Sequence, residues 1–304
     1  MLGAIARGLA RLAIRNLTLE DAQTRHARRP PLPEQFDFEE MRRDHEAGRI
    51  SRECRNWLEM MIVTEPGTPV YTAMLSGLED ARRPEFEAFR RFVVEIWTPE
   101  EAEHGECALR LAKAIGFDFD PAMVRDEADW ARGYFEACPP CHRVLGTAAY
   151  TVIQEELTYL SHRAYAECSG SPELTRMGHA IAAEERYHAC FYASRLRDAL
   201  EVAALDGMTE EEASGVVAEV VARFQMPTNF HSRAFRQHVN QEMRDQAKAH
   251  FLAHKATIKR QLGPLFMAAG GLPLVRAVVR AKSPIGRYAD EDAEAYARSS
   301  PAGE

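Results

Sequence analysis

The chain has 304 residues, of which 46% are hydrophobic, so it is long enough to bury the core of one large domain or of two smaller ones. Its formal net charge of -8 argues against general nucleic-acid binding. The sequence contains no apolar run of about eighteen residues, so we expect no membrane-spanning helix. The six cysteines are scattered, which favours a reducing compartment, the cytoplasm, over a disulfide scaffold.

The N-terminal region, residues 1–34, divides into two parts. Residues 1–15 form a short basic amphipathic stretch whose arginines at positions 7, 11 and 15 share one helical face. These arginines interrupt the apolar run that a signal peptide needs. We therefore expect a packed or frayed terminal helix, with a targeting or surface-contact role as the alternative. Residues 22–34 carry three arginines and three prolines, a composition that predicts an exposed arm.

Helical periodicity begins after this arm and predicts an all-α protein. In chain order, the expected helices span residues 36–48, 51–63, 70–80, 84–116, 144–166, 173–202, 209–224 and 234–262. Prolines and a glycine at 64–69 predict a break, and the residues between 116 and 144 predict a polar connection. We expect one helical domain over residues 35–262, followed by a basic segment and a disordered tail over residues 263–304.

Two of the expected helices carry a glutamate and a histidine at the same spacing. Glu101 precedes His104 by three residues, and Glu185 precedes His188 in the same way. Residues i and i+3 share a helix face, so a carboxylate oxygen and an imidazole nitrogen can reach one metal ion. Both pairs fall on the apolar stripe of their helix, where ionisable groups are unusual unless they are paired or bind metal. The alternative for each histidine is a hydrogen-bonded core residue.

Pro99 lies just before the first of these pairs. A proline in a helix interior removes a hydrogen bond and kinks the chain. We therefore expect either a kink before Glu101 or the start of a helix there, with Thr98 as the N-cap and Pro99 in the first turn.

Two further glutamates, Glu65 and Glu155, complete a metal-ligand set. The expected ligands are Glu65, Glu101, His104, Glu155, Glu185 and His188. Two Glu-x-x-His helices, with one inward glutamate from each of two others, form the ligand set of ferritin-like di-iron carboxylate proteins. Four carboxylates balance two divalent cations, and the oxygen-rich set favours two iron ions, with manganese in one position as the alternative. For Glu155, the alternative is a buried ion pair with an arginine.

The stretch Cys138-Pro-Pro-Cys141-His142 has the spacing of thiol redox pairs and of c-type haem attachment. An attached haem would need an exported protein, and a redox pair would need a strand-to-helix turn. Neither context is predicted, so we expect a loop between helices.

Several stretches, in order and at similar separations, resemble the soluble acyl-carrier-protein desaturases. They are Thr64-Glu65 with 69–75, Trp97-Thr98 with 100–105, Gln154-Glu155 with 157–162, the stretch 184–188, and Gln225-Met226-Pro227. The resemblance covers roughly residues 35–260. It implies a dimeric ferritin-like bundle with flanking helices. Such an enzyme takes electrons from a ferredoxin, activates dioxygen and removes two hydrogens from a fatty chain carried on acyl carrier protein.

The resemblance also assigns roles to residues. It places the six expected ligands at the family's ligand positions and Thr158 beside the oxygen site, where a hydroxyl could pass on a proton. Glu184 falls where the family has an aspartate that supports a ligand histidine, and Met74 falls in the lining of the acyl tunnel. Three residues depart from the pattern: Pro66 follows the first ligand, Glu184 is one methylene longer than the usual aspartate, and Tyr187 stands where the family has arginine.

Other functions remain open at this point. A di-iron hydroxylase or N-oxygenase with a specialised substrate is the alternative among enzymes. A ferritin-like protein that binds iron or docks a carrier protein without turnover is the alternative outside them. Arg82, Arg83, Arg90 and Arg91 could meet the acidic face of a carrier protein or form a solvated basic surface.

Overall fold

The computed structural model describes residues 17–118 and 120–223, together with Glu242, Asp245, Ala249 and short parts of 265–274. Over these residues the chain is helical and contains no strand. The stretches predicted at 1–15, 225–229, most of 234–262 and most of the tail lie outside the described residues. Among the helices that are described, none is long and apolar enough to cross a membrane.

The elements follow in chain order, with 3-10 segments and one π-helical segment labelled η. They are α2 (Leu19–Arg28), η1 (Leu32–Gln35), α3 (Phe38–Glu46), α4 (Arg52–Thr64), η2 (Glu65–Gly67), α5 (Thr68–Ser76), η3 (Pro84–Phe86), α6 (Glu87–Phe92), η4 (Val93–Trp97), α7 (Thr98–Ile115), α8 (Pro121–Glu136), η5 (Pro139–His142), α9 (Val144–Cys168), α10 (Pro172–Leu205) and α11 (Glu210–Arg223).

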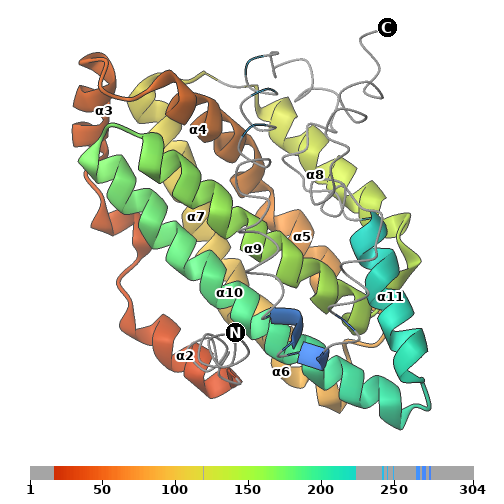
Figure 1. Ribbon diagram of the computed structural model, residues 1–304. Coiled ribbons are helices and arrows are strands. Elements are labelled where there is room, and N and C mark those ends of the chain that lie inside the picture. The colour runs from red at the N-terminus through yellow and green to blue at the C-terminus, as the bar shows by residue number, and fades with distance from the viewer. Residues whose placement is uncertain are drawn as a thin grey trace, which may run out of the picture.

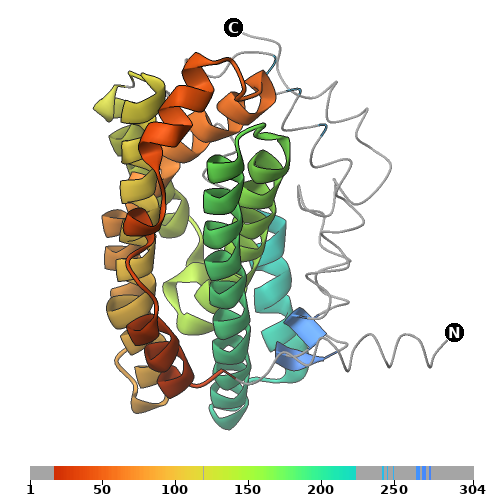
Figure 2. The same cartoon turned by 90° about the vertical axis from the view of Figure 1, so that its left-hand side faces the viewer.

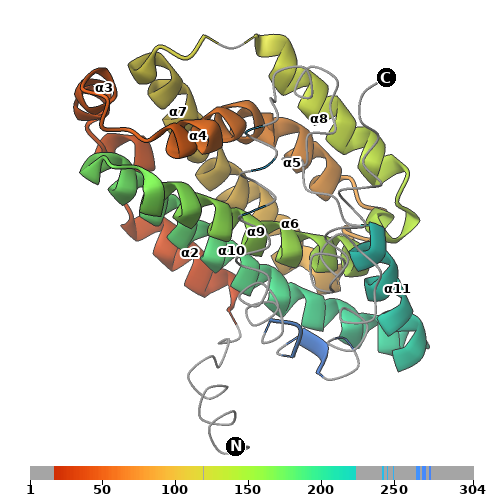
Figure 3. The same cartoon turned by 45° about the horizontal axis from the view of Figure 1, so that its top comes forward.

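Four helical columns form a bundle. Helices α9 and α10, joined by a short turn, cross the middle of Figure 1 side by side. The other two columns are composite: α4 continues through η2 into α5, and α6 continues through η4 into α7. Figure 2 shows these columns beside the α9 and α10 pair. In Figure 3, α2 lies next to α10, whereas α8 and α11 lie on another side of the bundle. The prediction of an all-α, ferritin-like bundle with flanking helices is confirmed.

The core consists of two apolar clusters with a polar layer between them. On α10, Ile181 packs in one cluster and Ala189 in the other. On α7 and the segment before it, Cys107 belongs to the first cluster and Trp97 to the second. The glutamates and histidines of both Glu-x-x-His motifs lie between these limits. The fold therefore brings them to one level of the bundle.

The segment around Pro99 is helical on both sides of the proline. Trp97 and Thr98 both have helical backbone angles, so the prediction that Thr98 caps a new helix is wrong. The preceding turn, η4, is π-helical, and the Thr98 hydroxyl donates a hydrogen bond to the Val93 carbonyl at 2.6 Å. The proline ring clashes with a carbonyl four residues earlier in a regular α-helix, and a wider turn relieves that clash. The column therefore continues into α7.

The predicted break at 64–69 is confirmed as the 3-10 turn η2. Pro66 lies in the first turn of this segment, where a missing N–H leaves no helical bond unmade. The Thr68 hydroxyl donates to the Glu65 carbonyl at 3.0 Å and helps to close the turn. Pro66 is therefore compatible with a buried Glu65 side chain, which is 8% exposed.

The exposed arm predicted at 22–34 is wrong over most of its length, because α2 occupies residues 19–28. Thr18 and Asp21 form a reciprocal capping box at its start, and Ala22 is fully buried. The three arginines of this stretch suggested solvent exposure. However, two of them, Arg25 and Arg29, pair with a buried carboxylate. That partner lies far away in the sequence, so local composition could not indicate it.

The polar connection predicted before residue 144 is also wrong, because most of it is α8. This helix begins at an N-cap, Asp120, whose Oδ1 accepts a hydrogen bond from the Ala122 N–H at 2.8 Å. Asp120 followed by Pro121 is a recognisable helix start. The sequence therefore contained a helix-start signal for α8, although the polar composition of the segment suggested a connection without a helix.

Candidate metal centre

The six residues expected as ligands come together from four elements. They are Glu65 on η2, Glu101 and His104 on α7, Glu155 on α9, and Glu185 and His188 on α10, and all are buried. They form two groups in which one oxygen or nitrogen atom from each residue lies within 4.8 Å of the others. These groups are Glu65, Glu101, His104 and Glu185, and Glu101, Glu155, Glu185 and His188. Glu101 and Glu185 belong to both groups, as carboxylates that bridge two metal ions would.

Each Glu-x-x-His pair shares a helix face, and the two faces meet. His104 Nδ1 lies 3.4 Å from Glu101 Oε2 on its own helix and 3.3 Å from Glu185 Oε1 on the other. His188 Nδ1 lies 3.7 Å from Glu185 Oε2 on its own helix and 3.1 Å from Glu101 Oε1 on the other. Each imidazole therefore points its Nδ1 atom at both of the shared carboxylates.

Several polar atoms at this meeting point are buried without a hydrogen-bond partner. They include Nδ1 of His104 and of His188, Oε1 of Glu101 and both carboxylate oxygens of Glu185. Buried polar atoms are normally satisfied, because an unpaired one loses its hydration without compensation. Five such atoms facing one another are the donor set that two divalent cations would satisfy. The residues present therefore fit a two-metal site.

The other nitrogen of each imidazole is held by a carboxylate. His104 Nε2 lies 3.0 Å from Glu184 Oε2, and His188 Nε2 lies 2.8 Å from Glu100 Oε2. A carboxylate that accepts a hydrogen bond from Nε2–H holds the proton on that nitrogen and leaves Nδ1 as the metal-binding atom. Each helix thus supplies the carboxylate for the histidine of the other helix. The sequence pointed to Glu184 but not to Glu100, although both directly precede a glutamate of the cluster.

Charges within the cluster shift the pKa values of its members. Burial opposes a charged imidazole, but the surrounding carboxylates outweigh it and raise the pKa of His104 and of His188 well above the usual value. Burial, reinforced by the charge of Glu185, raises the pKa of Glu155 well above its usual range. Burial also opposes ionisation of Glu185, but the neighbouring histidines prevail and lower its pKa. Protons and metal ions would therefore compete for the same atoms.

The comparison with known families agrees with this geometry. A family model described as fatty acid desaturase matches residues 31–250, most of the chain, and this span includes all six residues of the two groups. The chain belongs to the fatty acid desaturase family. Among curated proteins, none matches the chain. Membership in the fatty acid desaturase family makes it an oxidoreductase of desaturase type, and the buried groups are compatible with a di-iron site.

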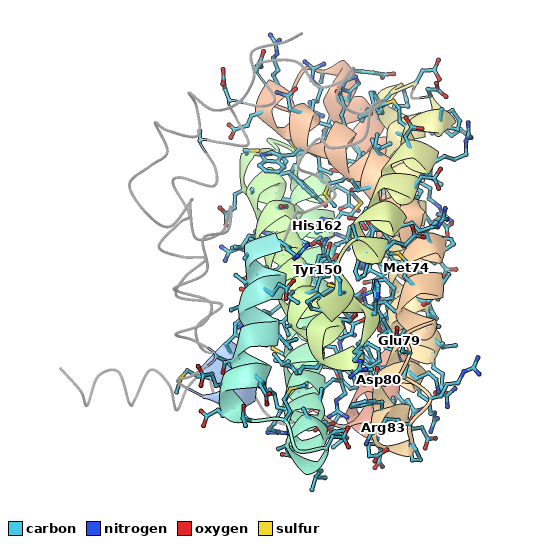
Figure 4. The ribbon with its side chains drawn as sticks, turned by 90° about the vertical axis from the view of Figure 1, so that its right-hand side faces the viewer. Met74, Glu79, Asp80, Arg83, Tyr150 and His162 are labelled. Atoms are coloured by element: carbon cyan, nitrogen blue, oxygen red, sulfur yellow. The ribbon has the colours of Figure 1, made fainter. Side chains whose placement is uncertain are left out.

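In this fatty acid desaturase family member, a third histidine also lies beside the cluster. His162 Nε2 is 3.5 Å from Glu65 Oε1 and 3.5 Å from Glu185 Oε1, and it has no hydrogen-bond partner. Its Nδ1 lies 3.1 Å from the Tyr165 hydroxyl. Figure 4 shows His162 in the interior of the molecule. One sequence signal indicates it: His162 follows Glu155 by seven residues, two helical turns, on the same face of α9.

A cavity of about 70 Å³ adjoins the cluster. It is lined by Met61, Thr64, Glu65, Thr68, Tyr71, Trp97, Glu101, Gln154, Glu155, Thr158, Ser161 and Glu185. Thr158 lines this cavity, and its hydroxyl donates to the Gln154 carbonyl at 2.9 Å; its predicted role in proton transfer stays a prediction. Trp97 Nε1 donates to Glu155 Oε1 at 3.1 Å, a contact that fixes one oxygen of this carboxylate.

Met74 is not part of the lining of this cavity. It is partly buried on α5, packs against the apolar cluster that contains Leu75, and lies apart from His162 in Figure 4. Its predicted contact with an acyl chain stays a prediction.

The Cys138-Pro-Pro-Cys141 stretch forms η5, a turn between α8 and α9, so the predicted loop between helices is confirmed. Both thiols are buried, and their sulfur atoms lie 3.0 Å apart. The turn is held against α9, where the Thr147 hydroxyl donates to the Cys141 carbonyl at 2.7 Å. A Cβ atom at Gly146 would lie 1.9 Å from the Pro140 carbonyl oxygen, so this close approach requires glycine.

Proposed function

We propose that the protein is an oxygen-dependent di-iron oxidase that desaturates a fatty acyl chain carried on acyl carrier protein. The observation that supports this proposal most strongly is the pair of buried ligand groups that share Glu101 and Glu185. Two separate metal sites would not share carboxylates, whereas two ions at a short separation would share them. Membership in the fatty acid desaturase family supports the reaction class.

The composition of the cluster favours iron. Each group holds three carboxylates and one imidazole, a hard ligand set that suits iron or manganese better than zinc. Four glutamates in total balance the charge of two divalent cations, so the loaded site would be close to neutral inside the bundle. We propose two iron ions, with manganese in one position as the alternative.

Two bound iron ions would supply the reduction of dioxygen and the removal of hydrogen from an unactivated chain. The chain's own residues would hold the two ions, orient their ligands and carry protons. His104 and His188 present Nδ1 because Glu184 and Glu100 accept from their Nε2 atoms. Trp97 fixes one oxygen of Glu155, and the Thr158 hydroxyl lies where it could pass a proton to the cavity.

The balance of the reaction defines the partners. Removing two hydrogens from the acyl chain while reducing dioxygen to two waters requires two further electrons and two protons. We propose a ferredoxin as the electron donor, acyl carrier protein as the carrier of the acyl thioester, and a homodimer as the assembly, on the basis of the resemblance of the motifs. A surface of Arg82, Arg83, Arg90 and Arg91 is the proposed place for the acidic carrier.

The test is the intact mass of acyl carrier protein loaded with saturated chains of several lengths. The ferrous-loaded protein, ferredoxin, its reductase, NADPH and oxygen should reduce the mass by two hydrogens. Omitting oxygen or replacing Glu185 by alanine should abolish the change. A gain of one oxygen atom would assign a hydroxylase instead. No mass change with any chain length would overturn the acyl substrate.

A further inference from the structure

Cations from α2 converge on the carboxylate behind His188. Arg25 Nη1 lies 3.0 Å from both carboxylate oxygens of Glu100, and Arg29 Nε lies 3.1 Å from Oε1. His26 Nδ1 lies 2.9 Å from the same oxygen. Glu100 is 0% exposed, so this carboxylate is buried between α2 on one side and His188 on the other.

The same two arginines reach the carboxylate behind His104. Arg29 Nη1 lies 3.3 Å from Glu184 Oε1, and Arg25 Nη2 lies 3.6 Å from it. Arg29 Nη1 also donates to Glu103 Oε2 at 2.7 Å, and Glu103 in turn accepts from the Leu32 N–H at 2.6 Å. One short helix therefore contacts both of the carboxylates that hold the histidines.

Charge counting explains why two cations are needed there. The four cluster glutamates already balance two divalent ions. Glu100 and Glu184 add two more negative charges in the buried layer, and a buried charge without compensation is costly. Arg25 and Arg29 supply two positive charges at short range. Among the buried groups, the count closes for the loaded site when these two arginines are included; Glu103, which Arg29 also contacts, is partly exposed.

We propose that Arg25 of α2 and Arg29, the C-cap residue of α2, are positioning residues that clamp Glu100 and Glu184 and so orient both histidines and set the electrostatic potential at the metal pair. This inference rests on the proposed di-iron function. Tyr187 marks the arrangement as a property of this chain. It stands at a position where the acyl-carrier-protein desaturases that the sequence resembles have arginine. Its ring centroid lies 4.3 Å from the Arg25 guanidinium, in cation–π geometry. Arg25 of α2 thus supplies a positive charge beside the position at which α10 carries Tyr187 in place of an arginine.

The clamp predicts the direction of a redox change. Reduction adds an electron to the metal pair, and nearby cations favour the reduced state by Coulomb attraction. Removing two cations from a buried, weakly screened position should favour the oxidised state. The reduction potential should then become more negative. A change in folding stability alone would not be expected to shift the reduction potential in the negative direction.

The experiment is an anaerobic redox titration of the iron-loaded full chain, comparing the wild-type protein with Arg25→Gln plus Arg29→Gln. Helix content and iron per chain are measured on every sample. We expect a shift to a more negative potential in the double variant and a potential near that of the wild type in Arg25→Lys plus Arg29→Lys. Arg28→Ala is the matched control, because Arg28 is exposed on the same helix. If the double variant loses helix content, the two single Gln variants provide the same comparison.

The outcomes separate the clamp from the proposed function. A wild-type protein without two irons per chain overturns both. A folded double variant that keeps its irons and shows an unchanged or more positive potential overturns the clamp alone. Loss of iron from the folded Gln variant, with iron retained in the Lys variant, supports the clamp because orientation of the histidines then depends on these charges.

Discussion

Each histidine of the cluster is held by a carboxylate from the other Glu-x-x-His helix. Glu184 and Glu100 lie next to the shared glutamates in sequence but serve the opposite imidazole. The spacing of Glu101 and His104 was readable from sequence because it is local. The role of Glu100 was not, because its partners His188 and α2 are distant in the chain and only the packing of helices brings them together.

The raised histidine pKa values predict that metal uptake releases protons. Burial opposes a charged imidazole, but the carboxylates outweigh it and raise the pKa of His104 and of His188, which favours a proton on Nδ1 as well as on Nε2 before metal binds. A metal ion needs the Nδ1 lone pair, so that proton must leave. The apparent affinity for ferrous or cobaltous ion should therefore fall as the pH is lowered.

Calorimetric titration of the metal-free protein with cobaltous ion, in two buffers of different ionisation enthalpy, measures this release directly. The heats should differ between the buffers by an amount that corresponds to at least one proton per metal ion. Equal heats in both buffers would show that the imidazoles bind metal without losing a proton, against the pKa directions given above.

At the scale of elements, local periodicity located the helices that pack by an apolar stripe. The predicted segments 51–63, 144–166, 173–202 and 209–224 correspond closely to α4, α9, α10 and α11. It failed for α2 and α8, whose polar composition suggested exposed chain. At Pro99 it left a kink or a new helix as alternatives, and it did not indicate the π-helical turn, which leaves no periodic pattern in the sequence.

Helices α9 and α10 pack against each other, and Gly178 lies at a close approach between them. A Cβ atom there would lie 2.6 Å from Tyr165 Cε2, 2.8 Å from the Ala166 Cβ and 3.1 Å from the His162 carbonyl oxygen. We expect Gly178→Ala to lower the free energy of unfolding by about 1–3 kcal/mol, the usual cost of overpacking. Denaturant unfolding of the metal-free protein measures this change.

Gly133→Ala is the matched control. This glycine lies in α8, and a Cβ atom there would meet nothing within 4 Å. Alanine should raise the free energy of unfolding by about 0.5–1 kcal/mol, because it favours the helical backbone. If Gly178→Ala were as stabilising as this control, the close approach of α9 and α10 would not limit the packing.

At the scale of the whole molecule, two apolar clusters enclose one polar layer, and that layer carries the chemistry. The bundle and the six clustered side chains were predictable because the spacing of a helix fixes which residues share a face. Of the two outer carboxylates, Glu184 was indicated by the family resemblance, whereas Glu100 and the helix α2 that binds it were not, because they complete a charge balance among distant segments. The six clustered side chains lie within the span that the fatty acid desaturase family model matches.

The central claim is that these six side chains hold two metal ions. The most direct measurement is the iron content per chain after anaerobic ferrous loading, compared between the wild-type protein and Glu101→Ala plus Glu185→Ala, the two carboxylates common to both groups. We predict about two irons per chain in the wild type and loss of both in the folded variant. Little iron in the wild type, or iron retained by the variant, would contradict the account.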